Sequence, residues 1–246
     1  DGDIGIEKII PESIVFNRQS FPWSTYNTAS ENHLYETRWI SSNVESRDVA
    51  YENCLIIGLE NSVADKMKLK LGDNSTCAFI GADNSIEELH EKIIERQWSL
   101  IIECSCNKLD RNRAIKSNLN LVQALIAVLG SGKSIPEVWI TSIGSRIAAG
   151  GTATTDAVMQ GWVSGFVKTV RIERPDIEIF HVDIEMDVSV SDQIIKLINS
   201  SLTIPPGDFE VAIRDQIVLV PRLMESKISS EGSDKMNVQE DGTYVI

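Results

Sequence analysis

The sequence predicts an α/β fold, in which a parallel sheet is covered by helices on both faces. Two observations carry this prediction. Short apolar runs recur along the chain, such as 54–58 and 77–81, and are typical of strands buried on both faces of a parallel sheet. Segments of helical period separate these runs, and such alternation of strand and helix is typical of parallel crossover units.

The order of the elements follows from the positions of the apolar runs and of the residues that end them. After the two runs above, the pattern predicts strands at 98–104, 138–143, 177–184, 209–213 and 216–220, the last two on either side of Arg214 and Asp215. Helices are predicted at 63–71, 112–129, 155–173 and 191–202, and a further helix begins after Ser85.

Residues at the predicted helix ends support these boundaries. Ser85 is followed three residues later by Glu88, which is the spacing of a capping box. Gly72 and Gly130 follow two of the helices, and Pro175 stops the helix at 155–173. The helix after Ser85 has one apolar face, made of Ile86, Leu89, Ile93 and Ile94.

Changes in composition mark the domain boundaries. Residues 1–50 form an irregular, aromatic-rich arm with one strand-like segment at 34–39, and we expect this arm to pack against an upstream domain. Residues 51–223 form the regular α/β subdomain. Residues 224–241 are polar and without period, which predicts a linker. Residues 242–246 are predicted to form the first strand of a following unit.

Charge and composition exclude several classes of protein. The chain has 246 residues and a formal net charge of −13, which opposes binding to nucleic-acid phosphates and to anionic membrane surfaces. Its apolar runs are far shorter than the roughly 20 residues that span a bilayer. The N-terminus has neither the basic nor the apolar region of a signal peptide. We therefore expect a cytoplasmic protein.

The cysteines indicate a reducing compartment. Cys54, Cys77, Cys104 and Cys106 lie in or beside predicted buried strands, where a thiol packs as a small hydrophobic side chain. Four cysteines are too few for a disulfide scaffold in a chain of this length. The spacing Cys104-x-Cys106 is not the usual spacing of a zinc site. We expect core thiols and no metal site.

The loop after the first buried strand, 58–64, is the candidate dinucleotide site. Gly58 has the position of the first glycine of a phosphate-binding loop, where the backbone must approach the pyrophosphate closely. The other glycines are missing, and Glu60 would place a carboxylate beside the phosphates. The sequence therefore predicts a loop that only turns the chain.

A reductase site is incomplete as well. Short-chain reductases place a serine after a central strand, a tyrosine further on, and a lysine one helical turn beyond it that lowers the tyrosine pKa for proton transfer. Ser142 follows the matching strand, but the region 154–156 contains no tyrosine, and Met159 stands one turn later. No Tyr-x-x-x-Lys occurs in residues 1–246. We interpret Ser142 as a loop hydroxyl.

The other candidate side chains form no constellation in the sequence. His33, His90 and His181 lie in an arm, on a helix and inside a strand, and we expect each to be structural. Asp183 and Glu185 alternate at the end of a strand, without a visibly paired serine or cysteine nucleophile. We expect no catalytic, cofactor-binding or metal-binding residue in this chain.

A series of motifs resembles the structural subdomain of the ketoreductase of polyketide synthases. The motifs are LYETRW at 34–39, VWITS at 138–142, GFVKTVRIERP at 165–175, HVDI at 181–184 and VAIRDQIVLVPRL at 211–223. Lys168 stands where arginine is usual in this family, and Gln216 where glycine is common. The resemblance covers roughly residues 34–246.

This resemblance implies a truncated Rossmann-like, short-chain-reductase-like fold, the first and inactive half of a tandem pair. The second half of the pair binds NADPH and reduces the β-ketoacyl group on the acyl carrier protein, and GTYVI at 242–246 resembles its first strand. The motif GFVKT at 165–169 is more similar to that of iterative, fungal-type synthases. The short linker leaves no room for an enoylreductase, so a partially reducing synthase like methylsalicylic acid synthase is expected.

The expected function is a non-catalytic scaffold for an NADPH-dependent ketoreductase within a multifunctional transferase of polyketide biosynthesis. Its expected partners are the adjoining catalytic subdomain, an upstream dehydratase-like domain and, indirectly, the acyl carrier protein. NADPH is expected in the adjoining half only. Two alternatives stay open: a free-standing NAD(P)-dependent reductase with an unrecognised site, and an interaction or dimerisation module of related fold.

Overall fold

The structure is a computed structural model, and it describes a defined part of the chain. The described residues are 34–42, 51, 53–59, 63–67, 76–81, 83–105, 110–151, 153–186, 189–199, 204 and 207–226. Contacts divide the chain into a body, Thr37–Leu223, and a second unit made of Asp1–Glu36 and Met224–Ile246. The predicted arm up to residue 33, most of the predicted linker and the predicted strand at 242–246 lie outside the described residues.

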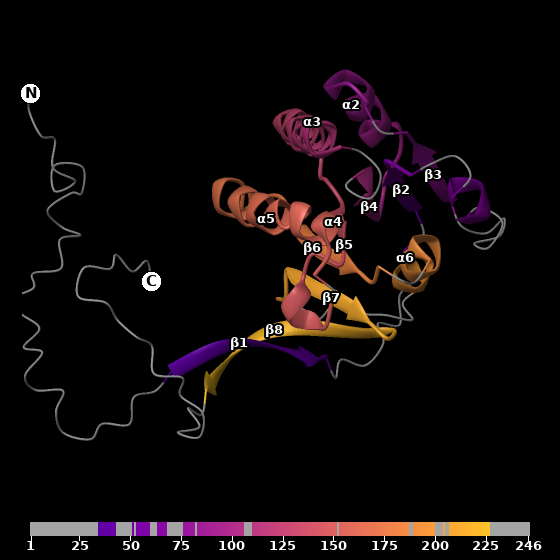
Figure 1. The fold of residues 1–246 in the computed structure, drawn as a ribbon. Helices are drawn as coiled ribbons and strands as arrows, with labels where there is room; N and C mark the ends of the chain where they lie inside the picture. Colours follow the sequence, from indigo (N-terminus) through magenta and orange to yellow (C-terminus); the bar gives the residue numbers. More distant parts are fainter. Residues whose placement is uncertain are drawn as a thin grey trace, which may run out of the picture. The chain divides into compact units, whose positions relative to one another are not determined.

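The fold is built on an eight-stranded sheet with the strand order β1-β8-β7-β6-β5-β4-β2-β3 (Figure 1). The strands are β1 (Leu34–Ser41), β2 (Asn53–Ile57), β3 (Thr76–Ile80), β4 (Leu100–Glu103), β5 (Glu137–Ile143), β6 (Ile179–Ile184), β7 (Glu210–Arg214) and β8 (Ile217–Ser226). All pairings from β3 through β7 are parallel, and β8 is antiparallel to β7.

This order is a shortened form of the doubly wound nucleotide-binding sheet. That sheet has the classic order 3-2-1-4-5-6, in which the chain reverses its direction of winding beside the first strand. Here β2 takes the place of the first strand, with β3 on one side and β4 on the other. Among the described residues no further strand lies beyond β3, and the chain passes from β3 through one helix directly to β4. The predicted truncated Rossmann-like fold is confirmed.

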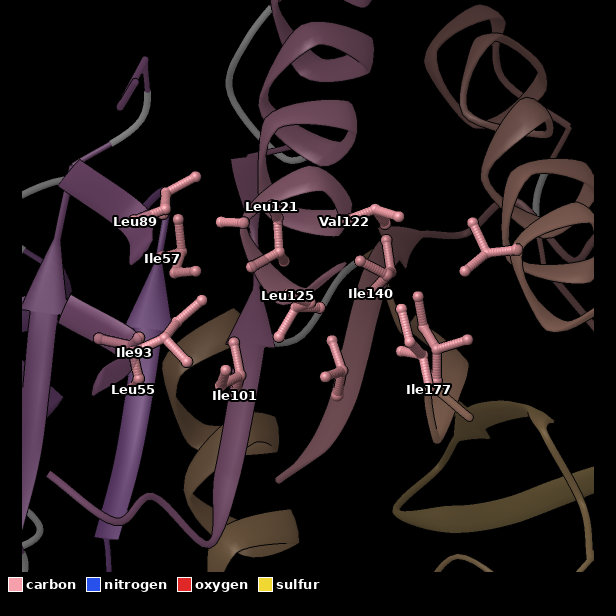
Figure 2. Close-up of a cluster of buried hydrophobic side chains, with 14 of the residues drawn as sticks. Leu55, Ile57, Leu89, Ile93, Ile101, Leu121, Val122, Leu125, Ile140 and Ile177 are labelled. Atoms are coloured by element: carbon pink, nitrogen blue, oxygen red, sulfur yellow. The ribbon is translucent and has the colours of Figure 1, made fainter. Parts of the chain in front are cut away.

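Helices cover both faces of the sheet. On one face, α2 (Ile86–Glu95), α3 (Arg111–Gly130) and α5 (Trp162–Glu173) share an apolar core with β2, β4, β5 and β6. In Figure 2, Leu89 and Ile93 of α2 lie beside Leu55 and Ile57 of β2. On the other face, α6 (Val190–Ile198) and the short helix at 63–67 pack against a second core. Burial of each such side chain stabilises the fold by about 1.5–3 kcal/mol.

The helix predicted at 155–173 is two helices in the structure. Thr154 caps α4 (Thr155–Met159), with its hydroxyl accepting from Ala157 N at 3.1 Å, and α5 begins only at Trp162. Between them, the Gln160 side chain turns back and accepts a hydrogen bond from Ile143 N at 2.7 Å, at the end of β5. The predicted single helix was wrong because this long-range contact fixes a break before Gly161.

The helix ends confirm some of the predictions and correct others. The capping box is present: Glu88 N donates to Ser85 Oγ at 3.1 Å, and Ser85 N donates to Glu88 Oε2 at 2.8 Å. Of the residues on the predicted apolar face of α2, Leu89 and Ile93 are buried and Ile94 is exposed, so the core face is narrower than the apolar face. Gly130 lies inside α3 rather than after it.

The strand β8 is longer than predicted and runs to Ser226, beyond residue 224 where the sequence predicts a linker. β8 pairs with β7 from Ala212 to Arg214. In the turn between the two strands, Asp215 and Gln216 have positive φ angles of 48° and 63°. In the part of the chain that the structure describes, no helix is both long and apolar enough to cross a membrane.

Candidate functional site

The carboxyl ends of β2 and β4 meet where a doubly wound sheet binds its ligand. Gly58, directly after β2, has a φ of +84° and donates to Ile80 O at 3.0 Å. Cys104 N donates to Ile57 O at 2.8 Å, so the chain after β4 is bonded to the end of β2. A Cβ atom on Gly58 would lie 2.6 Å from Ser105 N. The glycine at the position of a phosphate-binding loop is therefore required here by contact with the protein's own backbone.

A buried acid lies beside this contact. Glu103, the last residue of β4, is fully buried and accepts hydrogen bonds from Ser105 N at 3.1 Å and from Ser117 Oγ and Asn118 Nδ2 of α3 at 3.2 Å each. Burial raises the pKa of Glu103 to about 7, although its hydrogen bonds favour the charged form. Sequence reasoning missed this residue, whose only signal is a carboxylate at the end of an apolar run.

Ser142, the candidate reductase serine, lies near the end of β5 and is fully buried. Its hydroxyl donates to Asp183 Oδ1 at 2.5 Å. Ser142 Oγ also lies 2.7 Å from Ser145 Oγ and 2.8 Å from His181 Nε2. A hydroxyl has one proton, and Ser142 gives it to Asp183. No proton is left to donate to the carbonyl oxygen of a substrate.

Asp183 is the centre of the network that holds Ser142. Its Oδ1 accepts from Ser145 N at 2.8 Å and from Ser145 Oγ at 2.9 Å, and its Oδ2 accepts from Arg146 N at 3.0 Å. Arg214 Nη2, from the end of β7, completes an ion pair with Asp183 Oδ2 at 2.5 Å. The network therefore joins the ends of β5, β6 and β7 to the turn after β5.

His181 and Glu210 extend this network along the neighbouring strands, where they are register partners of β6 and β7. His181 Nδ1 lies 3.6 Å from Glu210 Oε1, which is too long for a hydrogen bond. Glu210 also contacts Arg146, accepts from Ser164 Oγ at 2.8 Å and pairs with Lys168 Nζ at 3.0 Å. His181 and Glu210 are therefore surrounded by cationic side chains as well as by serine hydroxyls.

The pKa values of this pair are displaced in the same direction. Burial lowers the pKa of His181 and so favours the neutral imidazole. Burial alone would raise the pKa of Glu210, but contacts with Arg146, Ser164 and Lys168 lower it well below its ordinary 4.5. The network thus holds an ionised Glu210 beside an uncharged His181.

The order Ser142–His181–Glu210 resembles a hydrolase triad in residue type only. In a triad the histidine Nε2 accepts the serine proton, and Nδ1–H points to the carboxylate. Here Ser142 gives its proton to Asp183, so the hydrogen-bond network assigns a proton to His181 Nε2, which donates to Ser142. This is the opposite tautomer, and the serine is sealed from solvent. The arrangement binds strands together and does not activate a nucleophile.

The other predicted candidates lie apart from this network. His90 lies on α2, and Glu185 accepts from Asp215 N at the β7–β8 turn. Met159 is exposed at the end of α4. His33 and Cys106 lie outside the described residues. Within the described ranges, no group of three or more histidine, cysteine or acidic side chains is placed to hold a metal ion.

A small cavity of about 200 Å³ adjoins the network. It is lined by residues that include Trp39, Ser145, Arg146, Lys168 and Glu210. Small-molecule and cofactor pockets usually measure about 300–1,000 Å³, so this cavity is smaller than most. Its charged lining is already paired within the protein, because Glu210 contacts both Arg146 and Lys168.

Solved structures share the fold of this chain. A ketoreductase-containing multidomain structure of a keto acid-selecting nonribosomal peptide synthetase module is similar with a TM-score of 0.61 and 13% identity, over 79% of this chain and 19% of that one. A C2-type ketoreductase from a modular polyketide synthase has a TM-score of 0.58 and 16% identity, over 78% and 43%. The first ketoreductase of the tylosin synthase has a TM-score of 0.51 and 17% identity, over 78% and 41%.

These likenesses show the fold, which is that of ketoreductase domains of polyketide synthases. The chain spans less than half of each of these structures. No protein-family profile and no curated protein sequence match the chain.

Proposed function

We propose that this chain is the non-catalytic structural subdomain of a polyketide synthase ketoreductase, and that it scaffolds the NADPH-dependent catalytic half. The observation that carries the proposal is the burial and the hydrogen bonding of Ser142. The one serine at the reductase position is fully buried, and its hydroxyl is committed to Asp183, Ser145 and His181. A catalytic serine must instead present its hydroxyl to the substrate carbonyl.

The strand ends beside β2 support the same proposal. Gly58 packs against the backbone of Ser105, and the end of β4 is hydrogen-bonded to the end of β2. The residues present do not fit a pyrophosphate, which needs several glycines and open backbone amides at this place. The buried Glu103 adds a carboxyl group directly beside the same point. In the proposal NADPH therefore binds only to the adjoining catalytic half.

The buried network gives the scaffold its rigidity. Asp183, Arg214 and Ser142 fasten three neighbouring strand ends to one turn, and the buried charges of Asp183 and Arg214 compensate each other only in this arrangement. The partners in this proposal are the catalytic ketoreductase subdomain, an upstream dehydratase-like domain and, through them, the acyl carrier protein. The synthase is proposed to be cytoplasmic, iterative and partially reducing.

Co-expression with the catalytic ketoreductase unit of the same synthase tests this function. We expect the catalytic unit to melt at a higher temperature and to reduce a β-ketoacyl thioester faster when this chain is present. The Arg214→Leu variant, which breaks the buried ion pair, should lose this effect, whereas Arg222→Leu, which removes an exposed pair with Asp208, should retain it. A catalytic unit that is equally stable and active alone would contradict a scaffold function.

A further inference from the structure

Two thiols face each other across neighbouring strands at the β3 side of the sheet. Cys54 of β2 and Cys77 of β3 are direct partners in the parallel register. The neighbouring Cys77 side chain is the largest cause of the raised pKa of Cys54, and both side chains belong to the same apolar core. Neighbouring strands lie about 4.8 Å apart, within the range of about 4.4–6.8 Å between the Cα atoms of disulfide-bonded cysteines. The backbone therefore already holds this pair at a distance that a disulfide can bridge.

The surroundings of the two thiols differ. Cys54 is fully buried in the core beneath α6, and its thiol also lies 3.9 Å from Tyr51 O. Cys77 is partly buried at the margin of the same core. A small oxidant from solvent therefore reaches Cys77 first and leaves Cys54 as the second thiol.

We propose that Cys54 and Cys77 form a reversible disulfide when the protein meets hydrogen peroxide. In the first step the Cys77 sulfur attacks one peroxide oxygen, the O–O bond breaks, and a sulfenic acid forms while the thiol proton leaves with the other oxygen as water. In the second step the Cys54 sulfur attacks the Cys77 sulfur, the S–O bond breaks, and a second water leaves with the Cys54 proton. One peroxide is reduced and two thiols are oxidised, and a small thiol reverses the reaction.

The bond would tie the amino-terminal part of β2 to that of β3, at the opposite end of β2 from Gly58. It cross-links two segments that are separated along the chain, and such a cross-link restricts the unfolded chain. The neighbouring Cys77 and burial raise the pKa of Cys54, so the thiol form predominates at neutral pH. Because the thiolate is the reactive form, we expect oxidation only when the peroxide concentration is raised. This inference does not rest on the proposed scaffold function.

Peptide mapping without reductant tests the proposal on the full chain. After treatment with a modest excess of hydrogen peroxide, we expect a cross-linked peptide that joins Cys54 to Cys77 and disappears on addition of dithiothreitol. The oxidised protein should melt at a temperature about 5–10 °C higher than the reduced protein. Cys104 lies at the end of β4 and is not the register partner of either thiol, so Cys104→Ser serves as the matched control and should keep the cross-link.

Single substitutions separate the proposal from general oxidation. Cys77→Ser and Cys54→Ala should each abolish the cross-linked peptide and the gain in melting temperature. Circular dichroism of each variant establishes that it is folded, and Cys77→Ser keeps a polar group of similar size. Recovery of Cys77 as an unlinked thiol or as a sulfinic acid in the folded wild-type chain would overturn the proposal. A cross-link that joins Cys104 to another cysteine in place of this pair would also overturn it.

Discussion

Arg214 and Asp183 form an ion pair that solvent scarcely reaches: Arg214 Nη2 lies 2.5 Å from Asp183 Oδ2, and Asp183 is fully buried. Arg214 Nη2 also donates to Arg146 O at 3.1 Å. The pair therefore fastens β7 to β6 and to the turn after β5. Its charges neutralise each other, and the hydrogen bonds around Asp183 satisfy both carboxylate oxygens.

Removal of one partner of this pair should be costly. Arg214→Leu leaves an uncompensated carboxylate in the interior, and we expect a loss of about 3–5 kcal/mol in the free energy of unfolding. Urea titration followed by circular dichroism measures this loss. Arg222→Leu is the matched control, since Arg222 pairs with Asp208 at the surface and such pairs contribute about 0–1 kcal/mol. Equal losses in the two variants would contradict a structural role for the buried pair.

Ser142→Ala separates a structural serine from a catalytic one. The substitution removes one donor from a buried network, and we expect a loss of about 1–2 kcal/mol in stability. Assembled with the catalytic unit, the variant should keep the wild-type kcat and KM for ketone reduction. A fall in kcat of about 100-fold or more in a folded variant would identify Ser142 as catalytic.

Gly58→Ala tests the close contact between the ends of β2 and β4. Gly132 has a similar φ of +78° but open space around its missing Cβ, whereas a Cβ on Gly58 would lie 2.6 Å from Ser105 N. Gly132→Ala should therefore cost only the backbone strain, about 1–2 kcal/mol. Gly58→Ala adds overpacking and should cost about 3 kcal/mol or more. Similar unfolding free energies for the two variants would show that the contact is loose.

The buried Glu103 gives the stability a defined pH dependence. Its pKa is raised from 4.5 to about 7 in the folded state, so the folded chain binds the proton more tightly than the unfolded chain. The corresponding stability is fully present below pH 4.5 and is lost as the pH rises through about 7, a change of about 3 kcal/mol.

Urea titrations at a series of pH values check this dependence with Glu103→Gln. The amide cannot ionise, so the variant should lack this decline and should gain stability as the pH rises toward 6.5, because the lowered pKa of His181 favours the folded chain when the imidazole is neutral. Glu210 contributes no slope in this window, because its pKa is lowered to about 2 and its stability contribution is lost only below pH 4.5. A decline that persists unchanged in Glu103→Gln would assign it to another group.

Local sequence signals predicted much of the fold. The strands at 54–58 and 77–81 and the capping box at Ser85 depend on neighbouring residues, and the structure has them within a residue. The break between α4 and α5 could not be predicted, because it depends on Gln160 reaching Ile143. Arg214 and Asp183 are 31 positions apart, and only the parallel pairing of β6 and β7 brings them together.

In the candidate site as well, local features could be predicted from the sequence and long-range contacts could not. The isolated Ser142 and the missing tyrosine and lysine were visible in the sequence, and they led to the expectation of no catalytic site, which stays a prediction. The network around Asp183 was not visible, because His181, Ser145 and Arg146 meet there only when β5 and β6 lie side by side. Glu103 was missed because a strand-end carboxylate carries no sign of its burial.

Fluorescence titration of NADPH with the isolated chain distinguishes a structural subdomain from a reductase. Binding to a catalytic reductase enhances the fluorescence of NADPH until the site is saturated, whereas the proposed structural subdomain has no site for the nucleotide. We expect no saturable change in fluorescence and no reduction of a β-ketoacyl thioester by the chain alone. Saturable binding in the micromolar range, together with NADPH oxidation that depends on the thioester, would show that the chain is itself a reductase.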